Sequence, residues 1–187
     1  MSERHLSEKS TVLLVVCLSA FGMPVMLSAT NVAIPIVANQ FSLSATQIAW
    51  IPMSYLMASV MFVLIFGKLA DVFGKRKIFL NGLLVLCFSS IFVALANSGN
   101  ALMLGRFLQG IGAAMLYATQ TALVSSVYPT KERGKAIGIT LSAVYLGLAV
   151  GPSLGGIIME HLSWRLNFVL HLPLILIILV LLHKVPS

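Results

Sequence analysis

Charged residues are scarce in this sequence. They make up 9% of its 187 residues, whereas hydrophobic residues make up 59%. Soluble globular domains usually carry about a quarter charged residues, so this chain lacks the side chains needed to cover a water-facing surface. The composition therefore excludes a soluble globular protein and indicates an integral membrane protein that contacts the lipid bilayer.

Cysteine is scarce as well. The only two, Cys17 and Cys87, lie within apolar runs, where a thiol behaves as a small hydrophobic group. Their spacing fits neither a disulfide framework nor a zinc site. The sequence also lacks a nucleophile elbow and a phosphate-binding loop. We therefore expect no enzyme activity, no metal and no cofactor.

Six apolar runs dominate the chain. Each is near or above the roughly 20 residues that a helix needs to cross the hydrocarbon core, although the sixth is somewhat short. Backbone groups in lipid must be hydrogen-bonded within a helix or a closed barrel, and the alternation typical of barrel strands is absent. The sequence predicts an all-α fold with transmembrane helices at residues 12–38, 48–67, 78–96, 102–127, 136–159 and 167–182.

These spans define the expected organisation of the chain. A short N-terminal segment, residues 1–11, precedes a six-helix bundle over residues 12–184, and residues 185–187 form the end. The first span is too long for the core of a signal peptide and lacks a cleavage site of small residues. We therefore expect this span to be retained as the first helix.

The basic residues are distributed unevenly between the loops. With the N-terminus inside, ten of the twelve Lys and Arg residues lie on the cytoplasmic side, and the other two are Arg106 and Arg165. Cytoplasmic loops of membrane proteins are enriched in these residues. This topology accounts for the net charge of +7 without a nucleic-acid partner. It predicts a multi-pass protein of the cell membrane with both termini in the cytoplasm.

The passage "GKLADVFGKRK", residues 67–77, concentrates five charges between two uncharged runs. We expect it to form the cytoplasmic turn between the second and third helices. Gly67 would end the second helix and allow close approach of a neighbouring helix. Asp71 could pair with Lys75 across one helical turn, or accept hydrogen bonds from a helix N-terminus.

Four stretches, in order along the chain, resemble motifs of the major facilitator superfamily. The motifs are the loop 2–3 signature, the arginine-containing helix 4 motif, the second cytoplasmic loop and the helix 5 motif associated with antiporters. The matching stretches are residues 67–77, "LGRFLQGIGAA" at 104–114, "YPTKERGKAIGI" at 128–139 and "GLAVGPSLGG" at 147–156. The resemblance implies half of a major facilitator fold, with two inverted three-helix repeats.

Two further stretches resemble, more narrowly, the fourteen-helix drug/proton antiporters. They are "NVAIP", which begins at Asn31, and "WRLNFVLHLP" at residues 164–173. The resemblance implies the N-terminal half of a multidrug exporter that exchanges a small hydrophobic or cationic substrate for protons. Such a half would need a second half or a second copy. The alternatives are a non-transporting fragment and an interaction partner that binds a full-length transporter through its second and fifth helices.

The family also implies roles for two groups of residues. The loop 2–3 signature forms a charge network that holds the two halves together on the cytoplasmic face, and Val72 departs from the base usual in this signature. The corresponding gate residues are Gly67, Asp71, Gly74, Lys75 and Arg76. The helix 5 motif forms a tight seal against leakage, and its residues here are Gly147, Gly151, Pro152, Gly155 and Gly156.

Polar residues within the spans are the candidates for transport and coupling. Arg106 and Gln109 share one face of the fourth helix, and a charge at this depth usually faces a cavity or a partner. The alternative is a cation that snorkels to the interface. Tyr55, Gln120 and Tyr145 could line a substrate cavity or make only packing hydrogen bonds.

The expected proton carrier is missing from this half. Related antiporters usually have an aspartate five residues before the stretch that begins here at Asn31, and that position is Met26. No Asp or Glu lies within the six spans, so Arg106 should act as a fixed cation held by Gln109, by backbone carbonyls or by an acid from a second half. His171 is the only titratable substitute deep in a span; its alternative role is a hydrogen bond to a backbone carbonyl.

Overall fold

The computed structural model describes residues 2–183, and side-chain surroundings for residues 9–182. This part of the chain contains helices and no strands. The elements are α1 (Ser2–Gln40), α2 (Ala45–Phe73), α3 (Lys75–Ala94), α4 (Gly99–Val127), α5 (Thr130–His161), the short 3-10 helix η1 (Trp164–Phe168) and α6 (Leu172–His183). Six helical segments, counting η1 and α6 as one, are long and apolar enough to cross a membrane. The expected end at residues 185–187 lies outside the described range.

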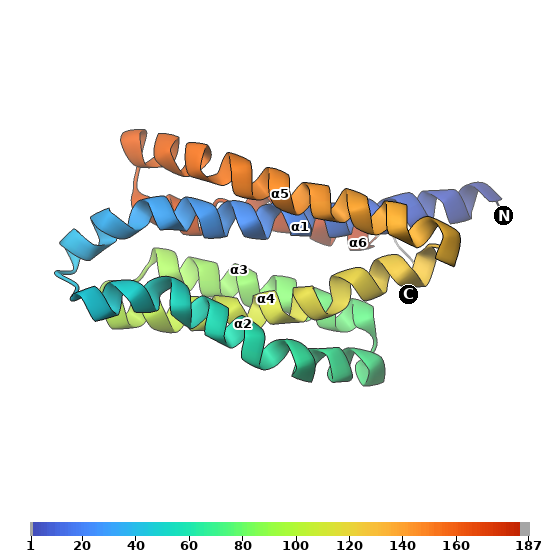
Figure 1. Cartoon of the computed structure of the whole chain (residues 1–187), viewed down its shortest axis with the longest axis horizontal. Helices are drawn as coiled ribbons and strands as arrows, with labels where there is room; N and C mark the ends of the chain where they lie inside the picture. Colours follow the sequence, from blue (N-terminus) through green and yellow to red (C-terminus); the bar gives the residue numbers. More distant parts are fainter. Residues whose placement is uncertain (1, 184–187) are drawn as a thin grey trace.

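The chain crosses the bundle back and forth, so its connections gather at two ends. The N-terminus, the α2–α3 turn and the α4–α5 turn lie at one end, which we call the terminal end (Figure 1). The α1–α2, α3–α4 and α5–η1 connections lie at the opposite end. Most of the basic residues are therefore near the terminal end.

The helices form two groups of three. In one group α1 packs against α5 and α6, and in the other α4 packs against α2 and α3 (Figure 1). The two groups correspond when α1, α2 and α3 are exchanged for α4, α5 and α6 in that order. The contacts of α1 with α5 and α6 then become the contacts of α4 with α2 and α3. Because α1 and α4 run in opposite directions, the repeat is inverted, as in the half-folds of major facilitator transporters.

Burial differs sharply between the helices. In the apolar stretch of α1, 67% of residues are buried, against 28% in α2 and 17% in α5. The main core cluster joins four of the helices around α1 through residues such as Met26, Tyr55, Phe79 and Ile178. The outward surfaces of α2 and α5 therefore face lipid or another protein segment.

The helix α2 is longer than its expected span. It continues through Gly67 to Phe73, and the turn to α3 consists of Gly74 alone, with a φ of 98°. Glycine adopts that conformation without steric cost. A single glycine within a helix costs only about 1 kcal/mol, so Gly67 does not end α2. A methyl group at Gly67 would meet no atom within 4 Å in the described part of the chain, so none of the helices described here makes the expected close approach at Gly67.

The turn also separates Asp71 from Lys75. Asp71 lies at the end of α2 and Lys75 begins α3, so the two are not on one helical turn. The ion pair found among residues 9–182 is Lys9–Glu132, with 3.7 Å between nitrogen and oxygen. The predicted Asp71–Lys75 pairing was therefore wrong. In the same passage, Arg76 donates a hydrogen bond to the carbonyl of Leu182 in α6.

The expected sixth span is not one continuous helix. It contains the end of η1, a non-helical stretch at residues 169–171, and α6. Pro173 fits the first turn of α6, where its missing N–H leaves no intrahelical bond unmade. Irregular backbone at membrane depth is tolerated where protein covers it, and Asn167, Phe168 and His171 around this break are buried.

Candidate coupling site and helix contacts

Arg106 is the centre of the buried polar groups. Its side chain is 0% exposed, and it lies in the third turn of α4, near the end opposite the terminal end. Its Nε donates to the Ile51 carbonyl at 3.4 Å, and its Nη1 donates to Gln109 Oε1 at 2.8 Å. Its Nη2 has no hydrogen-bond partner in the described part of the chain.

Two aromatic rings flank the guanidinium. The Arg106 Cζ atom lies 4.6 Å from the ring centroid of Tyr55 and 5.8 Å from that of Phe168. The face of an aromatic ring attracts a cation, more strongly where water is excluded. Within residues 9–182 no carboxylate forms an ion pair with Arg106. The charge is therefore stabilised by ring faces, an amide and a backbone carbonyl.

A chain of hydrogen bonds leads from Arg106 to His171. Gln109 Nε2 donates to Ser90 Oγ at 2.8 Å, and Ser90 Oγ lies 3.2 Å from His171 Nε2. The second N–H of Gln109 points to Met26 Sδ at 3.6 Å. The structure thus brings together Arg106 and Gln109 of α4, Met26 of α1 and His171 of the stretch just before α6. Spacing on α4 accounts for the first pair, because residues three apart share a helix face.

Asn31 is not part of this cluster. It lies on the exposed side of α1, whereas Met26, five residues earlier, is 0% exposed. Tyr145 is also exposed, at 68%. Tyr55 is buried, and its hydroxyl lies 3.3 Å from that of Tyr117.

Ser90 and Asn167 are two buried polar residues that the sequence did not single out. A serine in an apolar helix commonly bonds its own backbone, as the adjacent Ser89 does with the Val85 carbonyl, so Ser90 carried no distinguishing signal. Asn167 Nδ2 donates to the carbonyls of Ala29 and Gly155, at 3.3 and 3.5 Å. The resemblance of residues 164–173 to the antiporters could have drawn attention to Asn167.

Three glycines of α5 lie directly against α1. A Cβ atom on Gly147 would collide with the Phe21 carbonyl, one on Gly151 would lie 2.8 Å from the Val25 carbonyl, and one on Gly155 would lie 2.8 Å from Ala29 Cα. Glycines four apart share one helix face and let two backbones approach closely. Pro152 is exposed, and a Cβ atom on Gly156 would meet nothing within 4 Å. The motif therefore divides into a packed face and an open face.

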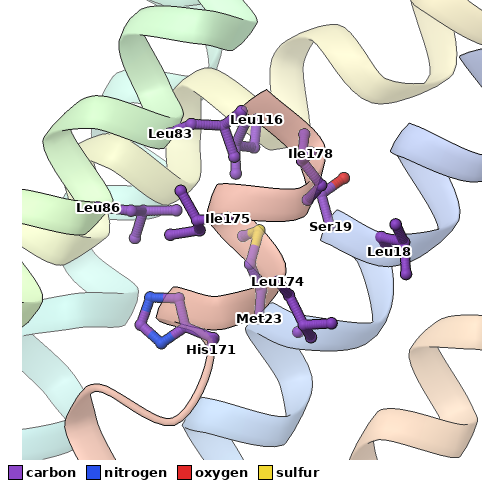
Figure 2. Close-up of a pocket in the computed structure, with 11 residues that line it drawn as sticks. Leu18, Ser19, Met23, Leu83, Leu86, Leu116, His171, Leu174, Ile175 and Ile178 are labelled. Atoms are coloured by element: carbon purple, nitrogen blue, oxygen red, sulfur yellow. The ribbon is translucent and has the colours of Figure 1, made fainter. Parts of the chain in front are cut away.

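A small cavity of about 10 Å³ adjoins His171. Its walls come from α1, α3, α4 and α6 and are apolar except for His171 and Ser19 (Figure 2). A larger apolar groove of about 460 Å³ follows the outward face of α2, from Thr46 through Trp50 to Val60. Among the described residues, no group of three His, Cys, Asp or Glu side chains could hold a metal ion.

The sequence matches the family model of the Major Facilitator Superfamily over residues 16–187. The chain belongs to this superfamily. The match begins within α1 and includes all of the later helices, and with the six apolar helices and the inverted contact pattern it identifies a transporter-type bundle.

Three relatives are about a third identical to the chain over the aligned residues. The riboflavin transporter RibZ of Clostridioides difficile is 34% identical over 90% of this chain and 37% of its own length. The multidrug resistance protein Stp of Mycobacterium tuberculosis is 35% identical over 77% of this chain and 27% of its own length. The methylenomycin A resistance protein of Bacillus subtilis is 29% identical over 88% of this chain and 35% of its own length. The chain thus spans about a third of the curated relatives it matches.

Proposed function

We propose that this chain works as the N-terminal half of a secondary active transporter that exports small hydrophobic or cationic compounds in exchange for protons. The observation that carries the proposal is the fully buried Arg106 with its hydrogen-bonded partner Gln109. A buried charge in a membrane span is expensive and marks a transport or coupling pathway. Two of the named relatives are resistance proteins, which favours drugs as the substrates.

A second half, or a second copy, completes the proposed transporter. Substrate sites in this class of fold lie between repeated units, and α2 and α5 leave most of their surface uncovered. The groove along α2 offers an apolar wall with Trp50, Met53 and Met57, which suits a hydrophobic compound. In this arrangement Asp71 and Lys75 contribute to a gate between the halves at the terminal end.

The exchanged proton is carried by a group outside this half. The usual acid position, Met26, holds a thioether that contacts Gln109 Nε2 at 3.6 Å, and a thioether does not titrate. Arg106 acts as a fixed cation that an acid of the second half or the substrate approaches during the cycle. The glycine face of α5 keeps α1 and α5 sealed against proton leakage.

The chain alone is expected not to export a cationic dye. In vesicles that hold only this polypeptide under monomer-forcing conditions, an imposed proton gradient should drive no more efflux than in protein-free vesicles. A fusion of this chain to a second six-helix half should export the dye when the same proton gradient is imposed. Gradient-driven efflux by the monomer would contradict the need for a second half. A fusion that binds a full-length transporter but exports nothing would favour the interaction-partner hypothesis.

Both termini are expected on the cytoplasmic side of the cell membrane. The basic residues near the terminal end, such as Lys9, Lys75 and Lys131, predict this orientation. Tags before Lys9 and after Lys184 should be unreachable from outside intact cells and reachable after permeabilisation. A tag at Ser98, in an exposed loop at the opposite end, serves as the outward control. Labelling of either terminal tag in intact cells would overturn the topology.

A further inference from the structure

The hydrogen bonds of Arg106 hold its guanidinium only in part. The bond from Nε to the Ile51 carbonyl is 3.4 Å long, beyond the usual range of about 2.7 to 3.2 Å for such bonds. Nη2 has no partner in the described part of the chain, so the short bond from Nη1 to Gln109 fixes one atom. The rings of Tyr55 and Phe168 are the other described groups that set the orientation of the guanidinium.

Among these contacts of Arg106, Phe168 alone comes from the other three-helix group. Ile51 and Tyr55 are in α2 and Gln109 is in α4, so all three belong to the group that contains Arg106. Phe168 ends η1, the segment that leads into α6. Its ring centroid lies 5.8 Å from the Arg106 Cζ atom, within the roughly 6 Å over which a ring face attracts a cation. This ring therefore links the charge on α4 to the group of α1, α5 and α6.

Two buried residues of η1 hold this segment against α1. Side chains three residues apart lie above one another in a 3-10 helix, so Trp164 and Asn167 share one face. Trp164 Nε1 donates to Gln40 Oε1 at 2.6 Å, and Asn167 Nδ2 donates to the Ala29 carbonyl at 3.3 Å. Both acceptors belong to α1, so this face of η1 is fastened at two points along that helix.

Phe168 lies on a different face of η1 from Trp164 and Asn167, and it is 1% exposed. Its ring meets that of Trp164 edge-on, with the centroids 5.8 Å apart and the planes at 86°. The Trp164 ring meets that of Phe41 in the same way, at 6.0 Å and 82°. Closely packed buried side chains cannot change rotamer without displacing their neighbours. The place of Phe168 beside Arg106 is therefore set by η1 and its contacts with α1.

We propose that Phe168 is a positioning residue for Arg106, and that its ring face holds the guanidinium in place between η1 and α2. The role rests on the proposed function, in which Arg106 is the fixed cation of the coupling site. Because a ring attracts the cation without accepting a conventional hydrogen bond, Nη2 stays available to an acid or a substrate. The buried ring also excludes water, and a charge in a low-dielectric site interacts more strongly with its partners.

NMR of the arginine side chains in the full protein, reconstituted in lipid bilayers, tests the contact directly. The Arg106 signals are identified by their loss in Arg106→Ala. A ring face shifts the signals of atoms that lie over it, so Phe168→Leu, which keeps an apolar side chain but removes the ring, should move the Arg106 signals. Leu166→Ala, on the remaining face of η1 and 40% exposed, should leave them in place. Unchanged signals in Phe168→Leu, or equal shifts in both variants, would overturn the proposal.

Fluorinated phenylalanine separates the attraction of the ring from its shape. Fluorine withdraws electrons from the ring face with little change in size, so the attraction to a cation weakens while the packing is kept. Trifluorophenylalanine at Phe168 should lower proton-linked dye transport by the completed transporter about two- to tenfold. Phe41 is the matched control, because its ring has the same edge contact with Trp164 but no cation over it among the described residues. Equal losses at the two positions would show that the contact with Arg106 is not the cause.

The double variant Phe168→Leu with Arg106→Ala shows whether Phe168 acts through the arginine. In the Arg106→Ala background, Phe168→Leu should cause no further loss of transport, because the charge that it positions is gone. A full additional loss would indicate an independent structural role and contradict the proposal. Normal transport by Arg106→Ala alone would remove the proposed function instead, and the NMR signals would then decide by themselves whether Phe168 positions Arg106.

Discussion

Arg106→Ala is expected to lower proton-linked transport by the completed transporter about 10- to 100-fold. A hydrogen bond to a charged group contributes about 1.5 to 3 kcal/mol, and each 1.4 kcal/mol in a barrier changes a rate about tenfold. Expression should hold, because the substitution removes a charge that is costly to bury within a membrane span. Dye transport and membrane yield are measured together.

Arg165→Ala is the matched control for this change. Arg165 also donates to a backbone carbonyl, that of Ala96 at 3.1 Å, but it is only partly buried. The Arg165→Ala variant should transport the dye at about the rate of the unmodified protein. Normal transport by Arg106→Ala would remove the basis for the proposed coupling site.

Two companion variants locate the proton carrier. Met26→Asp places a carboxylate beside Gln109, where Met26 Sδ now lies 3.6 Å from Nε2, and should strengthen the pH dependence of transport. His171→Asn should leave that pH dependence in place, because the carrier is proposed to lie outside this half. Loss of pH dependence in His171→Asn alone would identify the histidine as the carrier.

Gly151→Ala is expected to destabilise the bundle by about 1 to 3 kcal/mol, the usual cost of overpacking a tight contact. The new methyl group would lie 2.8 Å from the Val25 carbonyl and would collide with Ser28 Oγ, so α1 and α5 must move apart. At roughly 2 to 4 °C per kcal/mol for a chain of this size, the melting temperature should fall by about 2 to 12 °C. Thermal unfolding in detergent measures the shift.

Gly156→Ala provides the control on the same helix. Among the described residues, a methyl group there meets no atom within 4 Å, and alanine favours the helix over glycine by up to about 1 kcal/mol. This variant should melt at or above the temperature of the unmodified protein. Equal destabilisation by the two substitutions would show that α1 and α5 are not packed as described. Proton leakage through the completed transporter should rise only in Gly151→Ala if the packed glycines form the proposed seal.

The sequence by itself determined the all-helical membrane fold and several helix faces. An apolar run of about 20 residues can satisfy its backbone in lipid only as a helix or in a closed barrel, so six runs predicted six helices. Helical periodicity likewise placed Arg106 beside Gln109 and put three glycines of α5 on one face. These properties depend on residues close together in the chain.

Only the tertiary structure decided which groups from different helices meet. His171 reaches Arg106 through Ser90 of α3 and Gln109 of α4, whereas Asn31 faces outward although it lies in a family-like motif. The end of α2 at Gly74 and the break before α6 were also absent from the hydropathy pattern. An apolar run predicts that a helix forms, but its rotation and depth depend on packing against its neighbours. Those contacts, made between residues far apart in the chain, decide which polar side chains are buried together.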